Sequence, residues 1–141
     1  MLDIFAFDLP EDMQADEISN MELDIITNKI GDEVILRNVI FSSGSSNIDS
    51  SSYYELDMLV AYLYKNPDVS IQIQGHTDNI GSDIDNQTLS YNRAKVVFDY
   101  LKDRVHNKLE YVGYGESRPI SSNASESSRV LNRRTSFVII Q

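Results

Sequence analysis

One segment, residues 69–97, constrains the fold of this 141-residue chain most strongly. From Val69 to Gln74 apolar and polar side chains alternate, a period of two that is typical of a strand with one buried face. Gly75 ends the alternation, and a polar loop over residues 76–86 follows it. Ala94, Val97, Phe98 and Leu101 then recur at helical spacing. The segment therefore predicts a strand and a helix of about residues 86–105, joined by a polar loop.

This order brings opposite charges to neighbouring ends of two elements. Asp78 follows the predicted strand, and Arg93 lies early in the predicted helix. Asn86 and Arg93 are seven residues apart, so they share one helix face with Leu89 between them. A carboxylate beside a guanidinium suits a zwitterionic ligand, such as an amino-acid end with a free ammonium and a free carboxylate. A structural ion pair between Asp78 and Arg93 is the alternative interpretation.

The sequence before this segment predicts a hairpin and a helix. Two β-rich runs, residues 23–27 and 33–41, flank a turn at Gly31. A serine-rich loop follows, and Ser52-x-x-Glu55 has the pattern of a capping box at a helix start. Leu56, Leu59, Val60 and Leu63 give that helix one buried face, and Pro67 ends it.

The sequence after it predicts two more strands. Residues 109–114 form the first, residues 120–132 are a loop or short helix, and residues 135–140 form the last strand. The last strand is apolar on both faces, which favours an internal position. The order strand, helix, strand, helix, strand, strand predicts an α/β fold. We expect an α+β sandwich, in which a mixed four-stranded sheet carries two main helices on one face.

The charge of the chain is uneven. The net charge is −10, and residues 1–32 hold nine acids against Lys29 alone. We therefore divide the chain into an acidic linker or edge segment, 1–32, which contributes to the predicted hairpin, and a folded domain, 33–141. An acidic chain is a poor match for a phosphate backbone, so nucleic acid is not an expected partner.

Several classes of site are excluded by the composition and motifs. The chain has no cysteine, which rules out disulfides, thiolate metal sites and a lipid-modified N-terminal cysteine. It lacks the G-x-S-x-G, P-loop and H-E-x-x-H motifs, so we predict no enzyme, no catalytic residue and no cofactor. No metal site is predicted either. His76 is interpreted as a hydrogen-bonded structural residue, and the acidic loop after it misses EF-hand spacing. Three C-terminal arginines fit an anion site or an ion-pair cluster: Arg129, Arg133 and Arg134.

No apolar run reaches the roughly 18–20 residues that span a bilayer, and the N-terminus does not have the pattern of a signal peptide. If the protein is exported, we expect this chain to be mature or a fragment. Membrane association is then expected only through a missing part of the parent protein.

Residues from about 34 to 140 resemble the OmpA-like peptidoglycan-binding domain, which is also found in Pal lipoproteins and the stator protein MotB. The resemblance is carried by GHTDNIG at 75–81, GYGESRPI at 113–120 and NRRTSFVI at 132–139. Its most specific part is Thr77-Asp78, then ten residues, then Leu-Ser-x-x-Arg-Ala-x-x-Val from Leu89 to Val97.

The resemblance implies non-covalent binding of peptidoglycan through the diaminopimelate of its stem peptide. Asp78 would pair with the ligand ammonium and Arg93 with its carboxylate. The other implied contacts are Asn86 and Leu89 in the pocket wall, Thr77 orienting the loop, and backbone around Phe41, Ser42 and Ser43. The implied role is to anchor an outer-membrane or envelope protein to the cell wall from the periplasm.

One departure from the family pattern keeps a second hypothesis open. Ser42-Ser43-Gly44 stands where many relatives have an acidic or aromatic-rich segment. The alternative is a structural or assembly module of an envelope complex, stator-like or secretion-like, with a weakened pocket. An oligomer is compatible with both hypotheses.

Overall fold

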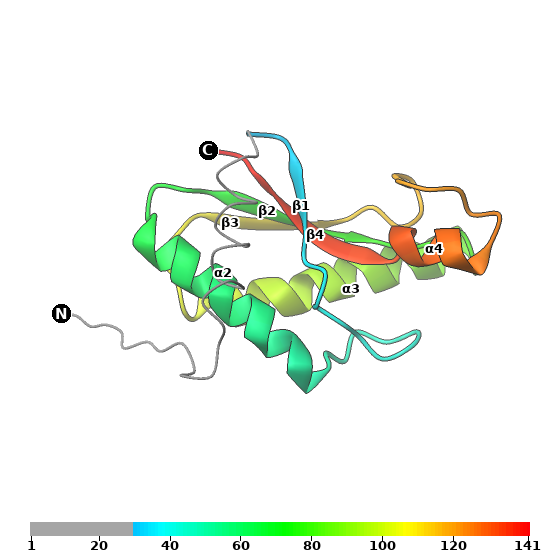
Figure 1. The fold of residues 1–141 in the computed structure, drawn as a ribbon, viewed down its shortest axis with the longest axis horizontal. Coiled ribbons are helices and arrows are strands. Elements are labelled where there is room, and N and C mark those ends of the chain that lie inside the picture. Colours follow the sequence, from blue (N-terminus) through cyan, green and yellow to red (C-terminus); the bar gives the residue numbers. More distant parts are fainter. Residues whose placement is uncertain (1–29) are drawn as a thin grey trace.

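A computed structural model describes residues 30–141 of the chain (Figure 1). Its elements in chain order are β1 (Glu33–Ile35), a 3₁₀ turn (Ser50–Ser52), α2 (Tyr53–Lys65), β2 (Ile71–His76), α3 (Asp83–Lys102), β3 (Leu109–Gly113), α4 (Glu126–Asn132) and β4 (Arg134–Ile139). The strands form one sheet in the order β1-β4-β2-β3. β4 is antiparallel to β1 and β2, and β2 is parallel to β3. The predicted mixed four-stranded sheet is therefore confirmed.

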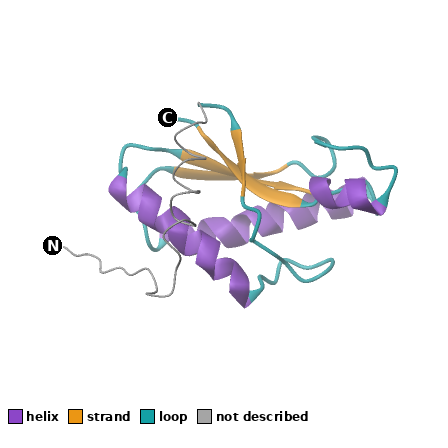
Figure 2. Cartoon of the chain, in the orientation of Figure 1, coloured by secondary structure: helices purple, strands orange, loops and turns teal. Residues whose placement is uncertain are grey.

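The core lies between the sheet and the two long helices, α2 and α3, which cover the same face (Figure 2). Ile71 and Ile73 of β2 stand opposite Ile139 and Phe137 of β4. These side chains and the apolar stripes of both helices are buried together. The alternation in β2 thus produces the buried face that the sequence predicts. β4 is internal, as expected from its apolar character.

Two glycines let α3 approach the sheet closely beside the end of β2. Gly75 and Gly113 are cross-strand partners in β2 and β3. A Cβ on Gly75 would lie 2.1 Å from Ser90 O, and a Cβ on Gly113 would lie 2.4 Å from Tyr91 N. No side chain fits in either place, so the helix backbone rests on the strand backbones. This contact fixes the N-terminal half of α3 beside the loop that contains Asp78.

The capping box predicted at Ser52 and Glu55 is wrong. Ser52 makes no capping bond to its own helix. Its hydroxyl instead accepts from the Ile40 N–H at 2.7 Å, and Glu55 Oε1 accepts from the Asn38 N–H at 2.8 Å. The two side chains satisfy amides of a distant segment and so tie the start of α2 to residues 38–40.

Two predicted boundaries also differ from the structure. β1 ends at Ile35 because the next residues turn away from the sheet, with the Val39 N–H donating to Leu36 O at 3.2 Å. α3 begins three residues earlier than predicted because Ser82 caps it, accepting from the Asp85 N–H at 3.1 Å. α4 agrees with the short helix that was one of the two expectations for residues 120–132. The predicted strand at 23–27 and most of the acidic segment lie outside the described residues.

Within residues 30–141, no helix is both long and apolar enough to cross a bilayer.

Candidate functional site

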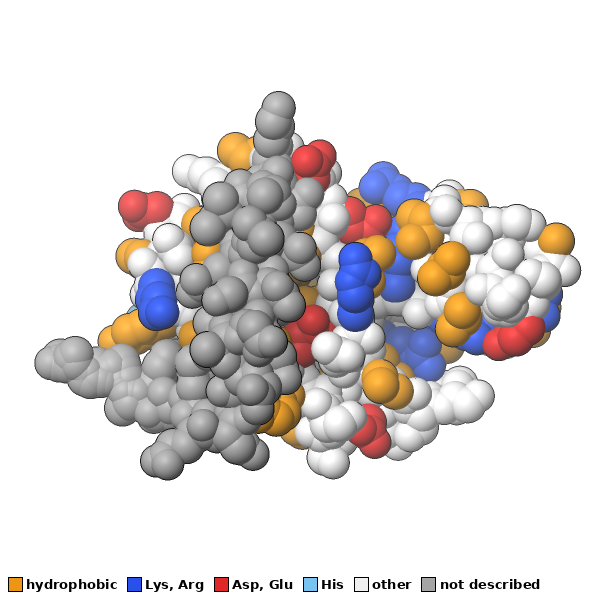
Figure 3. Space-filling view, viewed as in Figure 1, with side chains coloured by type: hydrophobic (Ala, Val, Ile, Leu, Met, Phe, Trp, Pro, Cys, Tyr) orange, Lys and Arg blue, Asp and Glu red, His pale blue; other side chains and the backbone are white. Residues whose placement is uncertain are grey.

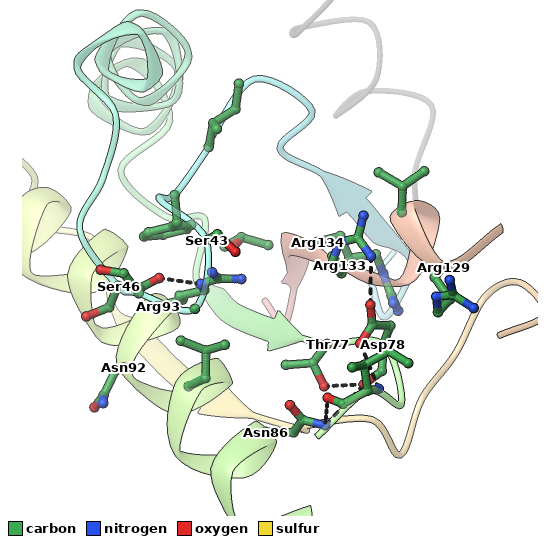
Figure 4. Close-up of a pocket in the computed structure, with 18 of the residues that line it drawn as sticks. Ser43, Ser46, Thr77, Asp78, Asn86, Asn92, Arg93, Arg129, Arg133 and Arg134 are labelled. Carbon is green, nitrogen blue, oxygen red and sulfur yellow. Dashed lines mark hydrogen bonds and ion pairs between the residues drawn. The ribbon is translucent and has the colours of Figure 1, made fainter. Parts of the chain in front are cut away.

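A groove of about 1520 Å³ opens where β2 gives way to the Asp78 loop (Figure 4). Its walls come from residues 37–46, the first half of α3, and α4 with the residues just after it. Seven of the eight predicted site residues line this groove: Phe41, Ser43, Thr77, Asp78, Asn86, Leu89 and Arg93. Ser42 does not line it.

Asp78 is held on one side of the groove by two partners. It is only 6% exposed. Its Oδ1 accepts from the Ile80 N–H at 2.9 Å, and its Oδ2 accepts from Arg133 Nη1 at 2.7 Å. Arg133 in turn pairs with Glu126 of α4 at 2.6 Å. The hydrogen bonds that Arg133 donates to Glu126 and Asp78 raise the pKa of Arg133, so this arginine stays charged.

The structural ion pair considered between Asp78 and Arg93 is therefore not formed. Figure 4 shows the two side chains on different sides of the groove, with Asp78 beside Arg133 and Arg93 beside Ser43 and Ser46. The cluster interpretation of the C-terminal arginines is confirmed. Arg133 pairs with Asp78, Arg134 with Glu33 at 2.8 Å, and Arg129 with Glu126 at 3.5 Å. Sequence reasoning identified Arg133 but not its place in the site, because its partner is 55 residues away.

Arg93 has no carboxylate partner within residues 30–141. Its Nε donates to Ser45 O at 2.8 Å and its Nη2 donates to Ser42 O at 3.2 Å. Its guanidinium carbon lies 5.1 Å from the centre of the Phe41 ring. Partial burial, and then the positive charge of Arg133, lower the pKa of Arg93. The groove thus contains a partly buried cation that has no counter-ion among the described residues.

The loop of residues 42–47, whose carbonyls accept hydrogen bonds from Arg93, is tightly turned. The Ser42 N–H donates to Asn47 O at 3.1 Å, the Ser45 N–H donates to Ser42 O at 3.0 Å, and Gly44 has a φ of 63°. A left-handed φ suits glycine because it has no Cβ. Ser42, which was expected to line the pocket, instead contacts Arg93 through its carbonyl.

Asn86 and Thr77 position the Asp78 loop. Both are buried, at 6% and 5% exposure. The amide of Asn86 donates to Ile80 O at 3.0 Å and lies 3.3 Å from Asp78 O, and the Thr77 hydroxyl donates to Asp78 O at 2.8 Å. Leu89 adds a partly buried apolar surface from the next turn of α3. The face predicted for Asn86, Leu89 and Arg93 is the face that α3 turns to the groove.

His76 lies outside the groove and is buried at 2% exposure. Its Nε2 is 3.6 Å from Glu33 Oε2. Burial, followed by the nearby charge of Arg134, lowers the pKa of His76 to about 4, so the ring is neutral near pH 7. In the part of the chain that the structure describes, no three side chains of His, Cys, Asp or Glu gather closely enough to hold a metal ion.

Comparison with known proteins gives consistent matches. Residues 40–133 match the OmpA family. The chain is 37% identical over 100 residues to outer membrane porin F of Pseudomonas aeruginosa, covering 69% of this chain and 29% of that protein. It is 36% identical over 103 residues to the peptidoglycan-binding protein ArfA of Mycobacterium tuberculosis, covering 72% and 32%.

Solved structures agree with the sequence matches. The peptidoglycan-associated lipoprotein of Burkholderia pseudomallei superposes with a TM-score of 0.65 at 29% identity, covering 72% of this chain and 87% of that one. A putative MotB-like protein of Desulfovibrio vulgaris has a TM-score of 0.69 at 24% identity, covering 88% of each chain, and shows likeness of fold alone. The chain spans only about three tenths of the length of the two curated relatives named above. The matched family, which covers most of the described residues, shows that this chain belongs to the OmpA family.

Proposed function

We propose that this chain binds peptidoglycan without catalysis, through the diaminopimelate of the stem peptide. It would thereby anchor an outer-membrane or other envelope protein to the cell wall from the periplasm. The observation that carries the proposal is Arg93, a partly buried cation without a counter-ion, across the groove from the buried carboxylate of Asp78. Relatives named as peptidoglycan-binding or peptidoglycan-associated support it.

The chemistry of diaminopimelate fits these two groups. The end of its side chain carries an ammonium and a carboxylate on one carbon. Arg93 uses Nε and Nη2 for backbone carbonyls, which leaves Nη1 for a ligand carboxylate. Charge-assisted hydrogen bonds of this kind are among the stronger ones in proteins.

Asp78 is the proposed site for the ligand ammonium. Its Oδ1 is used by Ile80, so the ammonium would bind at Oδ2, next to Arg133 or in its place. If the ligand ammonium displaces Arg133 from Oδ2 of Asp78, Arg133 keeps its ion pair with Glu126. Leu89 and the ring of Phe41 offer apolar surface to the methylene groups of the ligand.

The test is sedimentation of the purified chain with insoluble murein. We expect binding to diaminopimelate-type murein and little binding to lysine-type murein, because the lysine side chain has the ammonium but no carboxylate. Asp78→Ala is expected to abolish the binding. Equal binding to both mureins would contradict diaminopimelate recognition. No binding to either would contradict wall anchoring and favour the assembly module.

A further inference from the structure

The groove is basic although the chain is acidic. Five of the seven arginines line it, against three carboxylates, while the net charge of the chain is −10. None of the four lysines within residues 30–141 lines it. Figure 3 shows most of the visible blue side chains on the half of the molecule that carries α4. The groove therefore attracts anions and presents them with guanidinium groups rather than ammonium groups.

Two of these arginines have no acidic partner in the described part of the chain. Arg129, Arg133 and Arg134 are each paired with a carboxylate. Arg93 is bound only by carbonyls. Arg37 is exposed and makes no hydrogen bond or ion pair with any residue from 30 to 141. It lies two residues after the end of β1 and lines the groove together with Val39 and Ile40.

The groove is also larger than one amino-acid end requires. Its volume of about 1520 Å³ exceeds the range of roughly 300–1,000 Å³ that is usual for small-molecule pockets. If Arg93 and Asp78 hold the zwitterionic end of diaminopimelate, the rest of the groove has room for the residues that flank it. Arg37 lines the same groove, and its charge has no carboxylate partner among residues 30–141.

We propose that Arg37 forms a second anion subsite, which binds another carboxylate of the stem peptide. This inference rests on the proposed function. The peptide offers two such groups: the α-carboxylate of the D-glutamate joined to diaminopimelate, and the terminal carboxylate of D-alanine. Guanidinium binds carboxylates in a planar, two-point manner, so an amide in the same place is a poorer ligand. Arg37 thus makes affinity depend on the amidation of the peptide carboxyl groups.

The experiment is calorimetric titration of soluble muropeptides into the wild-type chain and Arg37→Gln. One ligand pair has the D-glutamate α-carboxyl group free or amidated. A second pair has the carboxyl group of the terminal D-alanine free or amidated. Arg37 is exposed and has no ion-pair partner among residues 30–141, so its replacement is expected to leave urea unfolding unchanged. The matched control is Arg104→Gln, since Arg104 lies beyond α3, donates to Tyr100 O, and does not line the groove.

For one of the two pairs, we expect loss of the carboxylate to weaken wild-type binding about threefold to fivefold, as for an exposed ion pair. Arg37→Gln is expected to bind both members of that pair with the same, weaker affinity, while Arg104→Gln behaves as wild type. The pair that responds identifies the carboxylate. Equal wild-type affinity within both pairs, or equal losses in the two variants, would overturn the subsite while leaving the proposed function standing. Failure of the wild type to bind any muropeptide would overturn both.

Discussion

Replacing Arg93 with alanine removes two hydrogen bonds that tie the 42–45 loop to α3. The bonds run from Nε to Ser45 O at 2.8 Å and from Nη2 to Ser42 O at 3.2 Å. Bonds from a charged donor contribute about 1.5–3 kcal/mol each. Partial exposure of Arg93 reduces this contribution, so we expect Arg93→Ala to lower the free energy of unfolding by about 1–2 kcal/mol. Urea unfolding measures this loss.

The same substitution has a larger effect on ligand binding. Loss of one partner of a hydrogen-bonded charge pair costs about 2–5 kcal/mol, or roughly 30-fold to several thousand-fold in Kd. Titration with a diaminopimelate muropeptide is the assay. Arg93→Lys keeps the charge but loses the planar fork, so it is also expected to bind poorly.

The role of Arg93 is decided by comparing how much Arg93→Ala lowers the free energy of unfolding with how much it weakens muropeptide binding. Arg104→Ala serves as a control, because it removes the same charge and a bond to a backbone carbonyl outside the groove. We expect this control to keep wild-type affinity. If Arg93→Ala loses stability but binds the muropeptide as tightly as the wild type, Arg93 is a loop anchor only, and the proposed carboxylate site is refuted.

Three other regions give independent predictions. Gly75→Ala places a Cβ 2.1 Å from Ser90 O, so α3 must move. Thermal unfolding should show that the free energy of unfolding falls by about 1–3 kcal/mol or more. A decrease well below about 1 kcal/mol would contradict the close packing. Arg133→Gln removes the ion pair of the buried Asp78 and should lower the free energy of unfolding by about 1–2 kcal/mol. A double-mutant cycle with Asp78→Asn should give a similar coupling energy, and zero coupling would argue against the pair. His76 has a folded-state pKa of about 4, below its ordinary value of 6.5, so its stabilising contribution is complete above pH 6.5 and is lost as the pH falls towards 4. Unfolding measured across this range should show a slope that His76→Gln reduces, and an unchanged slope would count against a buried neutral ring.

Local patterns in the sequence were sufficient for most of the fold. The alternation from Val69 to Gln74 predicts β2 because a period of two buries one face of a strand. The apolar character of residues 135–140 predicts an internal β4 because both faces of such a strand are covered. The spacing of Asn86, Leu89 and Arg93 places them on one face of α3 for the same geometric reason. These features depend on residues close together in the chain, so the sequence alone determines them.

Pairing between distant groups depended on the tertiary structure. Asp78 pairs with Arg133 rather than Arg93 because β4 follows α4 and brings its first residues to the end of β2, where His76 and Arg134 are register partners. Ser52 and Glu55 fit a capping box, yet they bind amides of residues 38 and 40 that another segment presents to them. A side chain selects among all donors and acceptors that the fold brings within reach, and spacing along the chain specifies only the local ones. Sequence therefore determined which elements form and that Asp78 and Arg93 belong to one site, while the packing of α4 and the 37–46 segment decided which other charges line the groove, which are neutralised and which remain for a ligand.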